Sequence, residues 1–196
     1  LYDNDMIKEK SVKGFTLIEL LVVIAILAVL ATAVVLIINP AELIRQGRDS
    51  TRLSDLDSLN TALSLYLADV DPVVSSLGAC SATAARCTVA SASSTFAVRT
   101  TCSTQAGTGV DGTGWLDVNL GSISGGSPLP RLPLDPANEG VFNYQYGCDN
   151  TNDWYEINAK MESDKYERGG GADVESTDGG HNVTSYEVGN DPGFDL

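Results

Sequence analysis

The chain has little of what most enzymes and nucleic-acid-binding proteins need. Its 196 residues include a single histidine, His181, and 12 basic residues against 26 acidic ones, which gives a formal net charge of −14. The sequence has no Gly-x-Ser-x-Gly motif, no phosphate-binding loop and no cluster of metal-ligand residues, so catalysis has no recognisable parts. The acidity argues against nucleic acid as a partner, because Arg86, Arg99 and Arg131 are too few to establish a basic patch.

Cysteines are also few, and their spacing is not that of a zinc site. Cys80, Cys87, Cys102 and Cys148 include no Cys-x-x-Cys pair, so disulfides in an oxidising compartment are expected instead. We favour Cys80–Cys87 with Cys102–Cys148, because the first two are seven positions apart, while the other two are separated by 46 positions. The nested pairing, Cys80–Cys148 with Cys87–Cys102, fits nearly as well.

One long stretch lacks charge altogether. Leu20 to Ile38 are nineteen residues, all Leu, Val, Ile or Ala except Thr32. As a helix, this run rises about 28 Å at ~1.5 Å per residue, which is enough to cross a bilayer core. Glu19 stands directly before it. A carboxylate in such a segment costs roughly 2.5 kcal/mol or more at the membrane centre and less near the interface, so we expect it to serve a purpose and to have a partner.

The residues before the apolar run form a specific motif. The segment from Lys13 to Glu19 reads KGFTLIE, and it resembles the class III signal of type IV pilins and of type II secretion pseudopilins. The resemblance implies that a prepilin peptidase cleaves after Gly14 and methylates the new amino terminus at Phe15. It also implies that Glu19 pairs with the methylated amine of Phe15 on an adjacent subunit. An ordinary signal peptide is disfavoured, because its apolar core is shorter, about 7–15 residues.

The leader indicates the orientation of the chain. It carries more basic than acidic residues between Met6 and Gly14, namely Lys8, Lys10 and Lys13 against Glu9. This charge favours a cytoplasmic N-terminus and export of everything after Ile38. We therefore expect a single-pass membrane protein before assembly, and a mature form in an extracellular pilus or a periplasmic pseudopilus. Met6 makes a more family-like start than Leu1.

An amphipathic helix is expected after the apolar run. Leucines and one tyrosine recur at three- and four-residue intervals, at Leu53, Leu56, Leu59, Leu63, Tyr66 and Leu67. Because a proline removes a helical hydrogen bond, Pro40 and Gly47 bracket a segment expected to kink or loosen. In the alternative interpretation, Pro40 begins a new helix with Asn39 as its cap. The helix is expected to end near residues 69–71, ahead of Pro72.

The rest of the chain predicts a small antiparallel sheet packed on this helix. Residues 72–114 are rich in Ser, Thr, Ala and Gly and are interpreted as a variable connecting loop. Strands are predicted at 115–120, 143–146 and 154–159. The expected class is α+β, and the resemblance implies a pilin fold. Its parts are a cleaved leader (1–14), a membrane-spanning and filament-core helix (15–38), its amphipathic continuation (39–71), the loop (72–114) and a β-sheet with an acidic, glycine-rich tail (115–196).

Calcium is the one metal that the resemblance suggests. Some pseudopilins bind calcium near their C-terminal loops, which makes Asp173, Asp178 and Asp191 candidate ligands. A solvated turn is nevertheless the favoured interpretation of these residues, and we expect no cofactor.

The resemblance implies self-assembly rather than catalysis. We expect a structural subunit of an extracellular type IV pilus-like helical filament. Its partners would be the prepilin peptidase, an inner-membrane platform protein, an assembly ATPase and other pilins. Two alternatives stay open. One is a pseudopilin of a type II secretion system, which the Pro-x-Asp-Pro turn at 133–136 favours. The other is a minor pilin that acts as a binding module in DNA uptake or adhesion.

Overall fold

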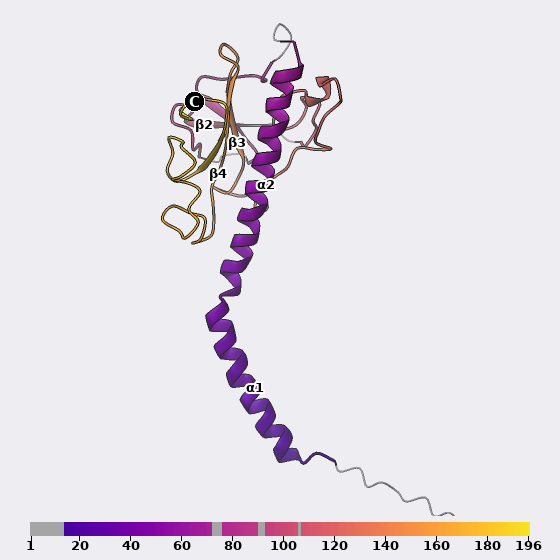
Figure 1. The fold of residues 1–196 in the computed structure, drawn as a ribbon, viewed down its shortest axis with the longest axis vertical. Helices are drawn as coiled ribbons and strands as arrows, with labels where there is room; N and C mark the ends of the chain where they lie inside the picture. The colour runs from indigo at the N-terminus through magenta and orange to yellow at the C-terminus, as the bar shows by residue number, and fades with distance from the viewer. Residues whose placement is uncertain (1–13, 72–75, 90–92, 106) are drawn as a thin grey trace, which may run out of the picture. The chain divides into compact units, whose positions relative to one another are not determined.

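The computed structural model describes residues 14–71, 76–89, 93–105 and 107–196. The leader residues Met6, Lys8, Lys10 and Lys13 lie outside them. Contacts divide the chain into two compact units between Pro40 and Ala41. The first contains helix α1 (Leu17–Ile38), and the second contains nearly all of helix α2 (Pro40–Asp69) and a five-stranded sheet (Figure 1). The predicted α+β class is confirmed.

The helical region is interrupted at Pro40, where the sequence predicted a break. Asn39 ends α1 in the left-handed conformation, with φ of 45°, and Pro40 is the first residue of α2. Proline suits the first turn of a helix, because its missing N–H would have no helical acceptor there. The interpretation in which Pro40 begins a new helix is therefore confirmed. The break does not extend to Gly47, which lies inside α2.

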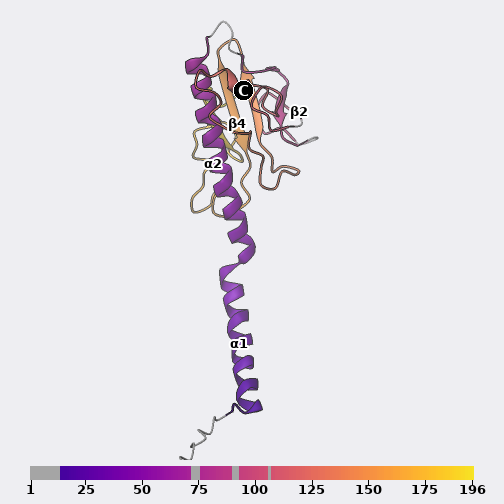
Figure 2. The same ribbon diagram turned by 90° about the vertical axis from the view of Figure 1, so that its right-hand side faces the viewer.

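One face of α2 packs on the sheet. Leu56, Leu59, Leu63 and Tyr66 are buried and lie on the same side of the helix. With large side chains of the sheet they form the main core. Figure 2 shows the ribbon of α2 beside the strands. The helix ends at Asp69, within the predicted range, and the Asp69 carboxylate accepts a hydrogen bond from the Ser124 N–H at 2.5 Å.

The sheet has the strand order β2-β1-β3-β4-β5. Its strands are β1 (Ala84–Cys87), β2 (Thr101–Thr104), β3 (Gln145–Asp149), β4 (Trp154–Ala159) and β5 (Tyr186–Gly189). β1 and β2 are parallel, and the other neighbours are antiparallel. β3 overlaps the strand predicted at 143–146, and β4 spans the one predicted at 154–159. β1 and β2 lie in the segment interpreted as a loop, so that interpretation was wrong for both of them.

The strand predicted at 115–120 is also wrong. Trp115, Leu116, Val118 and Leu120 are buried, as their alternation indicated. However, the backbone of this segment bonds to a neighbouring loop rather than to the sheet. The Trp115 N–H donates to the carbonyl of Gly107 at 3.0 Å, and a 3-10 turn, η1 (Leu120–Ser122), follows. The alternation of apolar and polar residues thus predicted which side chains are buried, but it did not predict how the backbone is paired.

Two disulfides join parts of the second unit. Cys80 bonds Cys148 across a Cα–Cα distance of 5.1 Å, and Cys87 bonds Cys102 across 5.5 Å. The favoured pairing, Cys80–Cys87 with Cys102–Cys148, was therefore wrong, and the nested alternative is correct. The physical reason is the parallel pairing of β1 and β2, which sets Cys102 opposite Ala85 and close to Cys87.

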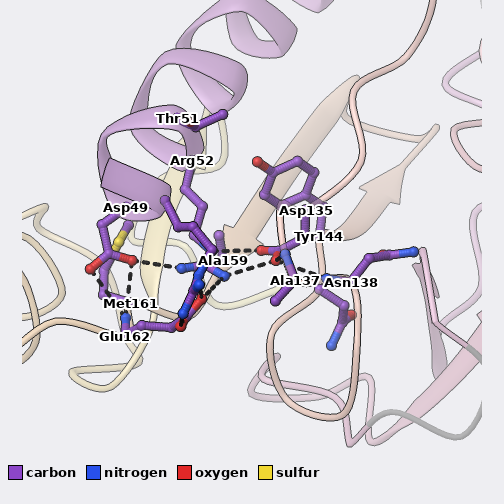
Figure 3. Close-up of polar contacts among 12 residues, drawn as sticks. Asp49, Thr51, Arg52, Asp135, Ala137, Asn138, Tyr144, Ala159, Met161 and Glu162 are labelled. Carbon is purple, nitrogen blue, oxygen red and sulfur yellow. Dashed lines mark hydrogen bonds and ion pairs between the residues drawn. The ribbon is translucent and has the colours of Figure 1, made fainter. Parts of the chain in front are cut away.

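A buried arginine connects α2 to two loops (Figure 3). Arg52 is 0% exposed, and its guanidinium donates to both carboxylate oxygens of Asp135, at 2.6 and 2.8 Å. It also donates to Asp49 at 2.7 Å and to Glu162. Burial would lower the pKa of Arg52, but these hydrogen bonds and charges raise it above its usual value. The cation also lies 5.3 Å from the centre of the Phe142 ring.

The partners of Arg52 in turn organise the backbone of the loops. Asp135, in the proline turn, accepts the N–H groups of Ala137 and Asn138 at 2.8 and 3.1 Å. Asp49 accepts the N–H of Ser163 at 2.8 Å, just after β4. A buried cation with several carboxylates is stable only as a complete set, because each removed partner leaves an uncompensated charge.

We predict that Arg52→Met destabilises the protein by about 3–5 kcal/mol, because Asp49, Asp135 and Glu162 would then share a buried site without their cation. Arg45→Met is the matched control. Arg45 is half exposed and lies 3.8 Å from Glu42, so its loss should cost less than about 1 kcal/mol. Urea unfolding of the full chain in detergent measures both. Equal effects of the two substitutions would contradict the central role of Arg52.

We also predict that the two disulfides contribute unequally. Cys80–Cys148 closes a separation of 68 residues and Cys87–Cys102 one of 15. Loop-closure entropy assigns them about 4 and about 3 kcal/mol respectively. The double variant C80S/C148S should therefore lose more stability than C87S/C102S in thermal unfolding. The reverse order would show that strand packing outweighs the entropy of the unfolded chain.

Candidate functional site

The N-terminus of α1 is closed by a reciprocal capping box. The Glu19 N–H donates to the Thr16 hydroxyl oxygen at 3.3 Å, and Glu19 Oε2 accepts from the Thr16 N–H and hydroxyl, both at 2.8 Å. These bonds satisfy N–H groups that a first helical turn leaves without acceptors. The Thr-x-x-Glu spacing is a sequence signal for this cap, and it was not among the expectations drawn from the sequence.

The cap holds the Glu19 carboxylate beside Phe15. Phe15 is 91% exposed. Together with Ile18, Val22 and Val23, these two residues line a shallow surface groove of about 380 Å³. No ion pair to Glu19 is formed within residues 14–71, 76–89, 93–105 and 107–196. The carboxylate thus has hydrogen bonds within its own chain, and no described residue supplies it with a charged partner.

Nothing in the described fold requires glycine at position 14. A Cβ atom placed on Gly14 would meet no atom within 4 Å. A requirement for a small residue at this position would therefore come from a partner that handles the segment.

α1 is apolar on every side and uncovered within its own unit. The span Leu17–Val35 has a mean hydropathy of 2.9 and no buried residue. The only polar side chain in its second half, Thr32, donates its hydroxyl to the carbonyl of Ala28 at 2.8 Å and so is satisfied inside the helix. α1 is therefore long and apolar enough to cross a membrane, either as a single-pass anchor or as a signal sequence.

The three aspartates considered for calcium accept hydrogen bonds within the chain, most of them from backbone N–H groups. Asp173 accepts from Gly169 and Ser176, and these hydrogen bonds lower its pKa to about 2. Asp178 accepts the N–H groups of Gly180 and Glu187 at 2.9 and 2.7 Å. The buried Asp191 accepts the Asp195 N–H at 2.8 Å. In the part of the chain that the structure describes, no three His, Cys, Asp or Glu residues are placed to hold a metal.

Comparison with known proteins identifies the N-terminal segment. Residues 10–35 match the family model of the prokaryotic N-terminal methylation motif. No curated protein and no solved structure matches the chain. The matched residues contain the KGFTLIE segment, the capping box and most of α1. The chain therefore carries the prokaryotic N-terminal methylation motif at the head of an apolar helix, consistent with the class III signal peptide of a type IV pilin-like or pseudopilin protein.

Proposed function

We propose that this protein is a structural subunit of an extracellular type IV pilus-like filament. The observation that carries the proposal is α1, a helix with apolar side chains all round, no cover within its own unit and one carboxylate near its N-terminus. Such a helix is stable in lipid. It is equally able to pack against copies of itself, because moving from lipid to a helix bundle exchanges one apolar surrounding for another.

The processing step follows from the motif. A prepilin peptidase cleaves between Gly14 and Phe15 and methylates the new amine. Cleavage creates a positive charge on Phe15, close to the groove that holds Glu19. On an adjacent subunit, that amine supplies the charged partner that Glu19 lacks within its own described chain.

Pairing across subunits specifies the register of the filament. A lone carboxylate in a low-dielectric core is strongly disfavoured, and a matched ion pair is much less so. A subunit docked one step out of place leaves both charges unpaired. An inner-membrane platform protein and an assembly ATPase would drive subunits into this register.

Electron microscopy of the cell surface tests the proposal against its alternative. Labelled antibodies to the second unit should decorate long extracellular filaments. A protein confined to the periplasm would instead indicate a pseudopilin of a type II secretion system, because both classes share the methylation motif and the apolar helix. Absence of assembly in either place would contradict a structural role.

We predict that Gly14→Val blocks processing, because the peptidase has to accommodate the residue before the cut. A Cβ atom at position 14 would meet no described atom within 4 Å, so the described fold gives no reason for the substitution to disturb the protein itself. Intact mass should show the uncut precursor. Gly14→Ala keeps a small residue and is the control, which should be shortened normally. A normally shortened Gly14→Val protein would show that cleavage does not depend on this position.

We predict that Glu19→Ala and Glu19→Leu leave the protein processed and in the membrane but abolish most filament formation. The cause is the unpaired amine of Phe15 in an apolar core. Thr16→Ala is the matched control, because it removes the cap at a cost of about 1 kcal/mol and keeps the carboxylate. Filament yield by shearing and sedimentation is the measurement. Equal losses for Thr16→Ala and Glu19→Ala would indicate that Glu19 acts only as a helix cap.

A further inference from the structure

The face of the sheet that points away from α2 is polar but buried. Along β4, Tyr155, Ile157 and Ala159 enter the main core, while Glu156 and Asn158 alternate with them. Glu156 is 1% exposed and Glu187, on the neighbouring β5, is 2% exposed. Acidic side chains are almost never fully buried without a partner. The burial of these two glutamates therefore requires an explanation, both of the segments that cover this outer face and of the groups that pair with the carboxyl groups.

Two segments distant in the sequence cover the outer face. The first is Ser93–Arg99, where the Thr95 N–H donates to Gln145 Oε1 at 2.8 Å. Phe96 lies over Gly147, whose hypothetical Cβ would come within 2.7 Å of its ring. The second is Asn190–Leu196, where the Leu196 N–H donates to Glu156 Oε2 at 3.3 Å. We call these two segments the outer cover.

The turn before β5 ties the cover to the carboxyl groups. The Asn182 N–H donates to Glu187 Oε2 at 3.0 Å, and the Asn182 side-chain amide donates to the carbonyl of Thr95 at 2.7 Å. Thr95 also accepts from the Asn158 side chain at 3.3 Å. Glu156 is thus bonded directly to the outer cover, and Glu187 is connected to it through Asn182.

The two carboxyl groups belong to diagonal neighbours on the outer face of the sheet. The register sets Asn158 opposite Glu187, and Glu156 is two residues away on the same face. Two ionised carboxylates are acceptors only and cannot bond to each other, so a direct bond between these two side chains requires a proton. Among the described residues, no donor reaches the buried Glu156 Oε1 or Asn158 Oδ1. The site therefore holds acceptors in excess, and a carboxyl proton is the missing donor.

The surrounding charges stabilise the ionised form of the two carboxyl groups only weakly. The negative charge of Asp191 repels an ionised Glu156, and that of Asp178 repels an ionised Glu187. Arg99 is attracted to Glu156, but its guanidinium donates to the carbonyls of Ser81 and Cys148, at 2.8 and 2.6 Å. Lys160 and His181 line an adjoining cavity of about 530 Å³ beside Asn182, rather than the pair itself.

We propose that Glu156 and Glu187 form a proton-dependent clasp, in which one carboxyl proton shared between them fastens the outer cover to the sheet. When the pair loses its proton, two adjacent buried negative charges repel each other, and the cover loosens. The clasp lies in the second unit and is independent of the assembly function proposed for α1.

The direction of the pH effect follows from the pair. Burial, followed by the neighbouring charges, raises the pKa of Glu156 to about 7 and that of Glu187 to about 8. Both lie above the usual carboxyl value, so the folded state binds protons that the unfolded state has released. The stabilisation is fully present below the usual pKa of a glutamate and is lost as pH rises through about 7 to 8.

Hydrogen exchange of the full chain in detergent micelles tests the clasp. One pKa unit corresponds to a tenfold change in an equilibrium, so the protection factors of the Asn182 and Leu196 amides should fall by about tenfold or more between pH 6 and pH 9. The amides that pair β3 with β4 should keep their protection. A fall shared by all amides would indicate global unfolding and would overturn the clasp, as would no fall at Asn182 and Leu196.

Matched variants separate the pair from other acids. Glu187→Gln supplies a permanent donor, so protection at Leu196 should become independent of pH over this range. Glu139→Gln removes an exposed carboxylate outside the clasp and should behave as the wild type does. Carbon-detected NMR of the wild type also reads the pair directly, and titration of both carboxyl carbons near the usual value of about 4.3 would contradict the proposal. If added calcium abolished the pH effect in the wild type, a bound cation rather than a proton would fasten the cover, which would also overturn it.

Discussion

The uncovered apolar surface of α1 is the constraint on which the rest of the account depends. Burying one large aliphatic side chain is worth about 1.5–3 kcal/mol, and thirteen of the nineteen residues in the span Leu17–Val35 are of this kind, none of them buried. Water is therefore excluded as the environment of this helix. Lipid and a bundle of like helices both surround the apolar side chains of α1 with apolar groups. Because the two environments are similar in polarity, transfer of the helix from one to the other is feasible. In the proposed function, Glu19 is the group that distinguishes these environments, because its proposed charged partner is the amine of Phe15 on a neighbouring chain.

The second unit has long loops around a small sheet. Disulfides and ion pairs, as well as the apolar core, hold these loops in place. Two disulfides hold β1, β2 and β3, and Arg52 fixes the proline turn and the segment after β4 to α2. On the outer face, the Glu156–Glu187 pair holds the cover in place. These interactions leave the assembly helix and the exposed domain to be stabilised by separate means.

The sequence predicted the elements whose signals are local. The apolar run predicted α1, the spacing of Leu56, Leu59 and Leu63 predicted the buried face of α2, and Pro40 predicted the break. Features that depend on distant pairing escaped it. Cys87 bonds Cys102 because β1 and β2 lie in parallel, and neither four-residue strand has a distinct pattern. The buried position of Arg52 had no local signal in the sequence, since its partners Asp135 and Glu162 lie more than eighty positions away. The capping box of Thr16 and Glu19 was visible in the sequence and was overlooked.

In the proposed function, cleavage at Gly14 is linked to assembly through Glu19, and the mature N-terminus tests that link most directly. Protein sheared or extracted from cells can be digested and its N-terminal peptide sequenced by tandem mass spectrometry. We predict a peptide that begins at Phe15 and carries one methyl group on its α-amine. A peptide that retains the leader, or one that begins after Ala33 as an ordinary signal peptidase would leave it, would contradict the account.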